Sequence, residues 1–359
     1  MTGGAPAAGR TDRPERGDGT RTVAPAEERP GGRLRHDAPA WRPAHTPVAC
    51  VGETMAALVP DPVAPLDSAD LLRVRIAGAE SNVAMYLADH GVPARWVSAL
   101  GDDPFGRRIR DEVAASGVDI SGVRTDPHRP TGILVKNPGP GGTTVHYYRR
   151  GSAASALGPG LLDDEAVRTA GLVHLSGITP ALSPDCLALV AALLRPAPGT
   201  RPCPVSFDVN HRPALWSDDT AAAVLHDFAN RADITFVGLD EAQALWGNGL
   251  AGPTDVRSLL PGPRILVVKD GGYAATAFEG TRVHTVPAPK TEIVEPVGAG
   301  DAFAAGFLAG LLRDEGMVRA LRLGHLTAGA ALGVTGDHGP LPDRGRIAAL
   351  LDMPPEMWA

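Results

Sequence analysis

Cysteine and aromatic residues are scarce in this chain. Its three cysteines, Cys50, Cys186 and Cys203, lie far apart in 359 residues. Their odd number and wide spacing exclude a disulfide framework and a C-x-x-C metal site, and they predict a reducing, cytoplasmic compartment. Aromatic residues make up only 4% of the chain although 43% of it is hydrophobic, so Ala, Val and Leu must build the core.

Long apolar runs and basic clusters are also missing. No run is long enough to span a bilayer, and no signal-like apolar segment opens the chain. The net charge is −7, and no Lys/Arg cluster lies within the expected domain. We therefore expect a soluble cytoplasmic protein that binds neither nucleic acid nor a membrane.

The first 45 residues differ in composition from the rest. They are mainly Gly, Pro, Ala, Arg and Glu, with almost no large apolar side chains. Such a segment buries too little surface to offset its chain entropy, which predicts a disordered N-terminal tail. Residues 46–359 are then expected to form a single domain.

From residue 47 onward, strand-like and helix-like stretches alternate. Strands are expected at 48–59, 72–76, 95–100, 172–175, 205–209, 234–237, 265–268 and 274–278. Helices are expected at 77–89, 105–115, 185–194, 220–231, 318–332 and 347–351. Two further helices are expected, a short one that begins at 240 and one that ends at 312. This order predicts an α/β fold with a mainly parallel central sheet and helices on both faces. Ligands then belong at the carboxyl ends of the strands.

One piece interrupts this alternation. The β-like runs 131–136 and 143–149 are separated by a turn rich in Pro and Gly, which predicts a hairpin. A hairpin outside the alternating pattern is a candidate lid or oligomer contact. We expect a small β lid over about 131–150 and a homo-oligomer, a dimer or larger.

A Gly-rich turn with a single acid precedes the most apolar helix. Gly298, Ala299 and Gly300 lead into Asp301 and eleven further residues without a charge. Unpaired N–H groups at a helix start favour an anion, and a carboxylate beside them can take a proton from a hydroxyl. This combination suits phosphoryl transfer to an alcohol. The alternative is a plain helix start in which Asp301 caps backbone N–H groups.

Other phosphate and metal motifs are absent from the sequence. No lysine follows a glycine, which excludes a P-loop. The stretch 247–252 matches G-x-G-x-x-G but follows an expected helix instead of a strand, and we interpret it as a loop. His and Cys spacing gives no zinc site, and no G-x-S-x-G nucleophile elbow occurs.

Two segments more than 200 residues apart resemble the signatures of one family. Gly-Ala-Gly-Asp-Ala-Phe at 298–303 is similar to the second signature of the ribokinase-like (PfkB) carbohydrate kinases, and 78–84 together with 100–106 is similar to the first. Residues 52–53, 147–155 and 206–216 most resemble 2-keto-3-deoxygluconate kinases. The resemblance covers roughly residues 47–345 and implies the three-layer ribokinase-like fold. It also implies transfer of the γ-phosphoryl group of ATP to the terminal hydroxyl of this sugar acid.

The resemblance also implies roles for individual residues. Asp301 is the expected general base, with Gly298, Ala299 and Gly300 around the transferring phosphoryl group. The residues expected to hold the substrate are Gly78, Asn82, Tyr147, Arg149, Arg212 and Asp337. ATP is expected along Lys269, Gly271, Gly272, Gly298 and Gly300, with Mg²⁺ near Glu241. From the residues alone, Arg149 and Arg212 fit surface arginines better than a binding site. Lys269 fits a solvent-exposed strand end equally well, and Glu241 fits an exposed helix acid equally well.

Some positions depart from the family pattern. Ala57 stands where many kinases of neutral sugars have an acid, which disfavours a fructokinase. Glu295 replaces a common Asp, and Gly238 replaces the usual Asn three residues before Glu241. The alternatives are a fructokinase-like or other neutral-sugar kinase, and a non-catalytic protein that senses sugar or nucleotide on the same scaffold.

Overall fold

The main sheet of the protein has nine strands. The computed structural model describes residues 46–358 except 140, 196–202, 217–219 and 248, so the predicted tail lies outside the described residues. The strands run in the order β13-β12-β11-β10-β9-β8-β1-β4-β5. All neighbours are parallel except β11–β12 and β12–β13, which are antiparallel. Their bounds are β1 Val48–Val51, β4 Ala94–Gly101, β5 Val123–Asp126, β8 Leu172–Ser176, β9 Val205–Asp208, β10 Ile234–Gly238, β11 Ile265–Asp270, β12 Ala274–Glu279 and β13 Arg282–Pro287.

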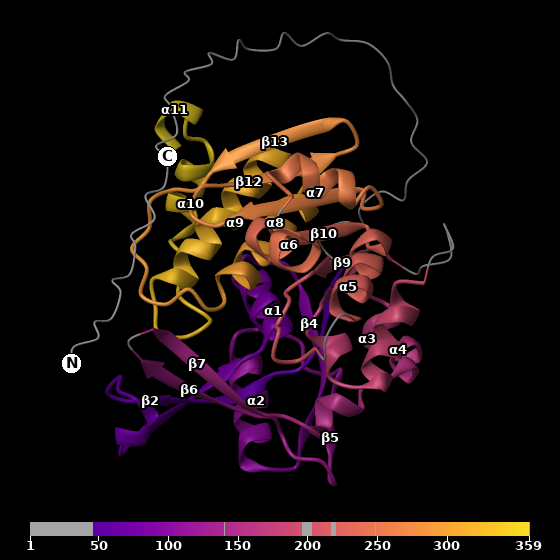
Figure 1. The fold of residues 1–359 in the computed structure, drawn as a ribbon, viewed down its shortest axis with the longest axis vertical. Coiled ribbons are helices and arrows are strands. Elements are labelled where there is room, and N and C mark those ends of the chain that lie inside the picture. The colour runs from indigo at the N-terminus through magenta and orange to yellow at the C-terminus, as the bar shows by residue number, and fades with distance from the viewer. Residues whose placement is uncertain (1–45, 140, 196–202, 217–219, 248, 359) are drawn as a thin grey trace, which may run out of the picture. The chain divides into compact units, whose positions relative to one another are not determined.

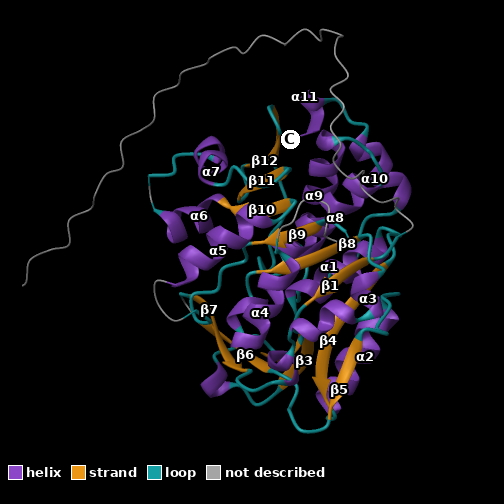
Figure 2. Ribbon diagram, turned by 90° about the vertical axis from the view of Figure 1, so that its right-hand side faces the viewer, coloured by secondary structure: helices purple, strands orange, loops and turns teal. Residues whose placement is uncertain are grey.

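Helices cover both faces of this sheet, as predicted (Figure 2). One face carries α1 Ala79–Asp89, α2 Pro104–Ala115, α8 Ala299–Leu312, α9 Met317–Leu332, α10 Arg344–Leu351 and α11 Pro355–Trp358. The other carries α3 Glu165–Arg168, α4 Pro184–Leu193, α5 Thr220–Arg231, α6 Leu239–Trp246 and α7 Pro253–Leu259. Short 3-10 turns lie at 66–68, 153–156, 159–163 and 179–181.

Two hydrophobic cores result from the alternation of side chains along the strands. In β1, Val48 and Cys50 join the core under α8 and α9, whereas Ala49 and Val51 join the core on the opposite face. Successive residues of a strand point to opposite faces, so a sheet covered on both sides needs a continuous apolar run. The buried runs in β1, β8, β10 and β11 meet this requirement.

A second sheet of four strands contains the predicted lid hairpin, and we refer to the whole sheet as the lid. Its order is β3-β2-β6-β7, with β2 Met55–Pro60, β3 Leu72–Ala77, β6 Ile133–Gly139 and β7 Gly142–Tyr148. The chain enters it twice, once between β1 and α1 and once after β5, and its strands gather at one end of the domain (Figure 1). The predicted hairpin is present as β6 and β7, and the lid is twice as large as predicted because β2 and β3 complete it.

The prediction of one strand over 48–59 was wrong. The chain leaves the main sheet after Val51 and enters the lid at Met55. At the crossing, a side chain on Gly52 would lie only 2.1 Å from Cδ of Glu80. The sequence is apolar on both sides of the crossing because both strands are buried, so hydrophobicity does not reveal the change of sheet.

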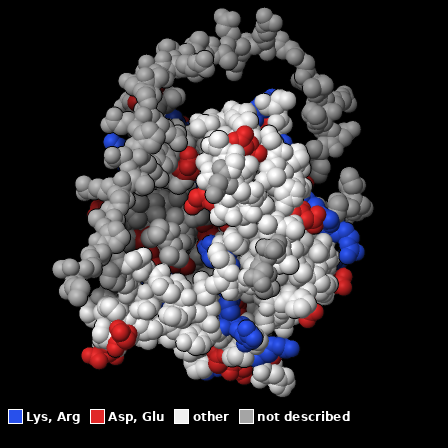
Figure 3. Space-filling view, viewed as in Figure 1, with Lys and Arg blue, Asp and Glu red and all other residues white. Residues whose placement is uncertain are grey.

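The described residues carry no helix with the length and apolarity that a membrane crossing requires. On the part of the surface that they form in Figure 3, acidic and basic side chains lie in small mixed groups among uncharged residues.

Candidate active site

Asp301 lies in the first turn of α8 but does not cap it. Gly298 is the N-cap residue, with a left-handed φ of 82°, and no side chain caps this helix. A Cβ at Gly298 would also lie 2.8 Å from the carbonyl oxygen of Asp337, so only glycine fits this turn. The Asp301 carboxylate instead faces inward, with 7% of the residue exposed.

Two amide side chains hold the Asp301 carboxylate. Asn82 on α1 donates from Nδ2 to Oδ2 over 3.0 Å, and Asn210 after β9 donates from Nδ2 to Oδ1 over 3.1 Å. Asn210 has a positive φ of 40°, an unusual conformation that asparagine tolerates better than most residues. Within the described part of the chain, the Oδ1 atoms of both asparagines are buried without a hydrogen-bond partner. These acceptors are available to a hydroxyl or a cation.

The environment of Asp301 raises its pKa to about 7. Burial is the largest cause, because it penalises the charged carboxylate. The Asn82 hydrogen bond and Arg212 lower the pKa, while the negative charges of Asp208 and Asp337 raise it. A carboxyl with a pKa near neutrality is a competent base at physiological pH.

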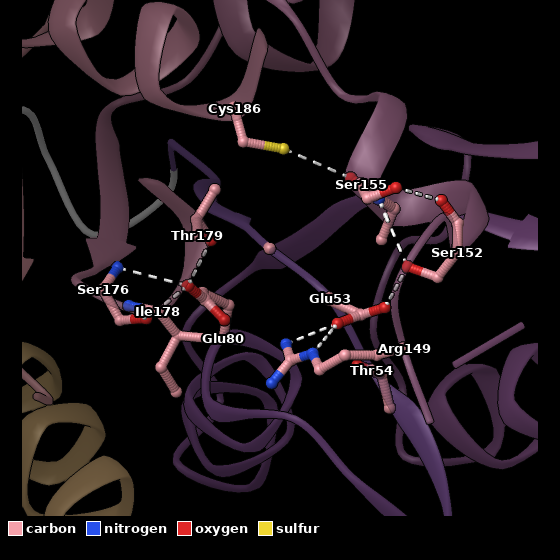
Figure 4. A network of polar contacts seen from close by, with 12 residues as sticks. Glu53, Thr54, Glu80, Arg149, Ser152, Ser155, Ser176, Ile178, Thr179 and Cys186 are labelled. Carbon is pink, nitrogen blue, oxygen red and sulfur yellow. Dashed lines mark hydrogen bonds and ion pairs between the residues drawn. The ribbon is translucent and has the colours of Figure 1, made fainter. Parts of the chain in front are cut away.

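The lid contributes Arg149 and Tyr147 to the same site. Arg149 is buried, and its Nε donates to Oε2 of Glu53 over 2.6 Å, while Glu53 Oε1 accepts the Ser152 hydroxyl. Figure 4 shows this carboxylate between the guanidinium and the hydroxyl. The guanidinium carbon lies 5.6 Å from the centre of the Tyr147 ring. Arg149 is therefore not a surface arginine.

One cavity brings most of the predicted substrate residues together. It has a volume of about 90 Å³, and its lining includes Gly78, Tyr147, Arg149, Arg212, Gly298, Asp301 and Asp337. Asn82 adjoins it through its bonds to Asp301 and, over 3.4 Å, to Oδ2 of Asp337. Arg212 is exposed, with one N–H group on the carbonyl of His211 at 3.2 Å.

Lys269 lies beside this cavity at the end of β11. Its Nζ donates to both carboxylate oxygens of Asp208, at 3.0 and 3.3 Å. Burial alone would lower the pKa of Lys269, but the charges of Asp208 and Glu241 raise it above its ordinary value. A Cβ on Gly300 would lie 3.3 Å from this ammonium. Lys269 is thus a paired lysine beside the start of α8, with a side chain only 19% exposed, and not a solvent-exposed strand end.

The surroundings of Lys269 fit a nucleotide. Gly271 and Gly272 follow it in an exposed turn with open space above both Cα atoms, and Gly271 has a φ of 49°. Exposed backbone at a glycine turn permits the close approach of a ligand. The ammonium and the N–H groups at the start of α8 favour phosphate there.

Glu241 is engaged with the backbone. Its Oε2 accepts the N–H of Gly238 over 3.1 Å, which caps the first turn of α6. Its Oε1 accepts the N–H of His211, in the loop after β9. Burial and the charge of Asp208 raise its pKa. The alternative of an exposed helix acid is therefore wrong. Within the described residues, no three His, Cys, Asp or Glu side chains are grouped to hold a metal ion. The oxygen atoms of Asp208, Asn210 and Glu241 suit an Mg²⁺ ion that is held mainly by phosphates and water.

Sequence reasoning missed four contributors to this site. Asp208 and Asn210 were visible as polar residues at the end of a buried strand, where ligands bind in α/β sheets. Lys136 and Glu295 form an ion pair across more than 150 residues, and only the fold brings them together.

Comparison with known proteins shows the family of the chain. The model of the pfkB family of carbohydrate kinases matches residues 45–344. A 2-dehydro-3-deoxygluconokinase from Bacillus subtilis (strain 168) is 34% identical over 314 residues, which cover 84% of this chain and 94% of the relative. A 2-dehydro-3-deoxygalactonokinase from Haloferax volcanii is also 34% identical, covering 80% of this chain and 91% of the relative.

The fold is likewise shared with solved structures. A putative ribokinase II from E. coli has a TM-score of 0.76 at 22% identity, with 85% of this chain and 98% of that chain covered. This likeness shows a ribokinase-like fold, as predicted. The family model and the two relatives together show that the chain belongs to the pfkB family of carbohydrate kinases.

Proposed function

We propose that the protein transfers the γ-phosphoryl group of ATP to the terminal hydroxyl of 2-keto-3-deoxygluconate or its C4 epimer, giving the 6-phosphate and ADP. The observation that carries this proposal is the buried Asp301 carboxylate, with a pKa of about 7, in one cavity with two arginines. The relatives named after the gluconate and galactonate forms of this sugar acid support the same substrate class.

The chemistry follows from the positions of the groups. Asp301 takes the proton of the sugar hydroxyl as its oxygen bonds to the γ-phosphorus and the bond to the β-phosphate oxygen breaks. The N–H groups of Gly298, Ala299 and Gly300 lie at the helix start where charge builds on the phosphoryl oxygens. Asn82 and Asn210 keep the carboxylate oriented toward the cavity.

Nucleotide binding is assigned to the adjacent surface. Lys269 and the Gly271–Gly272 turn face the phosphates together with Gly298 and Gly300. When bound, Mg²⁺ neutralises charge on the ATP phosphates. Glu241 would contact it through water, because both of its oxygens already accept backbone N–H groups.

Arginine recognises the carboxylate of the sugar acid. Arg212 is exposed at the cavity, and a guanidinium matches a carboxylate with paired donors. Arg149 already donates to Glu53, which fixes the orientation of its guanidinium. Gly78, Tyr147 and Asp337 complete the wall that receives the sugar.

An ADP-release assay across substrates tests this proposal. We expect the highest kcat/KM with 2-keto-3-deoxygluconate or 2-keto-3-deoxygalactonate and much lower values with fructose and ribose. Arg212→Met should lower kcat/KM for the acids by about 10- to 100-fold, since a charge-assisted bond contributes about 1.5–3 kcal/mol. The exposed Arg282, on the edge strand β13 and outside the lining of the cavity, provides the control Arg282→Met, which should leave kcat/KM unchanged. Equal loss for acids and neutral sugars in Arg212→Met would contradict carboxylate recognition.

A further inference from the structure

One buried lysine on the lid has no part in the reaction described so far. Lys136 lies on β6, and its side chain is only 6% exposed. It points to the same side of the strand as Leu134, which lines the sugar cavity with it. Burial of an ammonium is costly unless acids compensate for it. Lys136 should therefore have acidic partners.

Both partners belong to the body of the protein and not to the lid. Lys136 Nζ forms an ion pair with Oε1 of Glu295, in the segment that leads into the Gly298 turn. The same Nζ lies 3.9 Å from Oδ1 of Asp337, in the loop after α9. Lys136 thus connects the lid to the two segments that flank the start of α8.

Asp337 is in turn connected to the base. The Nδ2 group of Asn82 donates to Oδ2 of Asp337 over 3.4 Å and to Oδ2 of Asp301 over 3.0 Å. An amide nitrogen has two hydrogens, so one group serves both carboxylates. A displacement of Asp337 therefore changes the position of the amide that orients Asp301.

The two cavities around Lys136 indicate that this lid position is closed. The sugar cavity is about 90 Å³, below the ~300–1,000 Å³ of typical ligand sites. A second cavity of about 330 Å³ shares Lys136 and Asp337 as lining residues and also reaches Glu295. The lid must move to admit a sugar, and Lys136 lies in the wall between the two spaces. Its contacts with the body must then break and re-form in each turnover.

We propose that Lys136 is a positioning residue that ties closure of the lid to the orientation of the base. When the lid closes, its ammonium binds Glu295 and Asp337, and Asp337 then fixes the Asn82 amide that holds Asp301. The sugar-transfer part of this inference rests on the proposed function, whereas the contact between lid and body does not.

Several charged or titratable groups face the two carboxyls of Asp301 and Asp337. From the lid, the strand ends, α1 and the neighbouring loops, they are Lys136, Asp208, Arg212, Lys269, Glu295 and Tyr86. Of these groups, Lys136 lowers the pKa of Asp337, so removal of its charge raises the pKa of that carboxyl.

The test compares Lys136→Met with Lys136→Arg and with Lys290→Met. Lys290 is exposed and has no place in the site, so it is the matched control. For Lys136→Met we expect kcat to fall by about tenfold or more, as small misplacements of catalytic groups do. KM for the sugar should change much less than kcat, because Lys136→Met leaves the two arginines of the cavity in place. Lys136→Arg should restore kcat, and Lys290→Met should equal the wild type. A folded Lys136→Met enzyme with the kcat of the wild type would overturn the proposal.

Amide hydrogen exchange on the enzyme without sugar provides a readout that does not depend on activity. Residues 133–139 and 142–148 should exchange faster in Lys136→Met because the lid loses its ion pair with the body. Unchanged exchange there would also overturn the proposal. If Lys136→Met does not fold, Lys136→Met/Glu295→Gln removes both charges of the pair and permits the same measurements. If the wild type phosphorylates no sugar acid, the proposed function fails, and exchange still decides the role of Lys136.

Discussion

Two buried carboxyl groups, those of Asp301 and Glu80, have different roles because their surroundings differ. Asp301 faces a cavity and is held by amide donors from two elements. Glu80 is fully buried, and its Oε1 accepts hydrogen bonds from the hydroxyls of Ser176 and Thr179 at 2.7 and 2.9 Å. Figure 4 shows these hydroxyls converging on one side of the carboxyl group. Glu80 thus joins α1 to the last residue of β8 and to the 3-10 turn that follows.

The raised pKa of Glu80 should affect how the stability of the protein depends on pH. Burial raises its pKa from the ordinary 4.5, so the folded state binds its proton more tightly than the unfolded state. The contribution of Glu80 to stability is therefore full below about pH 4.5 and falls as pH rises toward the raised folded value. Glu80→Gln keeps the shape without titrating. We expect thermal melts of this variant to lose less stability between pH 5 and 8 than the wild type does. A variant with the same pH dependence as the wild type would contradict a raised Glu80 pKa.

The sequence predicted which residues belong to the site better than it predicted which side chains contact one another. The Gly-rich turn pointed to Asp301, and the cavity does contain most of the residues expected around the substrate. The pairing of Arg149 with Glu53, across 96 positions, was not predictable because a local pattern carries no information on distant charges. The same holds for the bonds from Asn82 and Asn210 to one carboxylate.

At the element scale, the packing of α8 against α9 places the catalytic turn. Gly306 lies where the two helices approach most closely, since a Cβ there would be 2.3 Å from Oγ1 of Thr327 and 2.5 Å from the carbonyl oxygen of Leu323. Phe307 packs edge-on against Phe236 of β10 with ring centres 5.4 Å apart. These contacts hold α8 between α9 and the sheet.

Gly306→Ala should therefore destabilise the protein although alanine favours a helix. Overpacking costs about 1–3 kcal/mol, which exceeds the roughly 1 kcal/mol gained from helix propensity. Gly329→Ala is the matched control in α9, because a Cβ there meets only ordinary contacts at 3.5 Å and beyond. Urea unfolding should show a loss for Gly306→Ala and a gain of up to about 1 kcal/mol for Gly329→Ala. Equal effects of the two variants would contradict a close approach at Gly306.

Helices and strands with a clear hydrophobic pattern were predicted, whereas short elements and edge strands were missed. The helix expected at 220–231 matches α5, and most strands of the parallel sheet were located within a few residues, but the edge strand β5 was missed. The edge strand β13, with exposed Arg282 and Val283, lacks the apolar run of the central strands and was missed. The crossing at 52–54 was missed because buried strands lie on both sides of it.

At the scale of the whole molecule, the site forms where two sheets meet. Arg212, in the loop after β9, and Asp301, at the start of α8, line the cavity from the body of the protein. The lid adds Lys136, Tyr147 and Arg149 to the same lining. Residues far apart in sequence thereby enclose one cavity. A closed lid excludes water, which limits transfer of the phosphoryl group to water.

The most direct test of this account is the pH dependence of kcat/KM for the wild type and for Asp301→Asn. The base acts when deprotonated, so we predict that wild-type kcat/KM falls as pH drops through about 7, the pKa of Asp301. Asp301→Asn should lose at least about 10²-fold in kcat and should lack this limb. It should also melt no lower than the wild type at pH 8, since a raised carboxyl pKa reduces stability as pH rises and Asn does not titrate. Wild-type turnover in folded Asp301→Asn, with the limb near pH 7 retained, would contradict the assignment of Asp301 as the base.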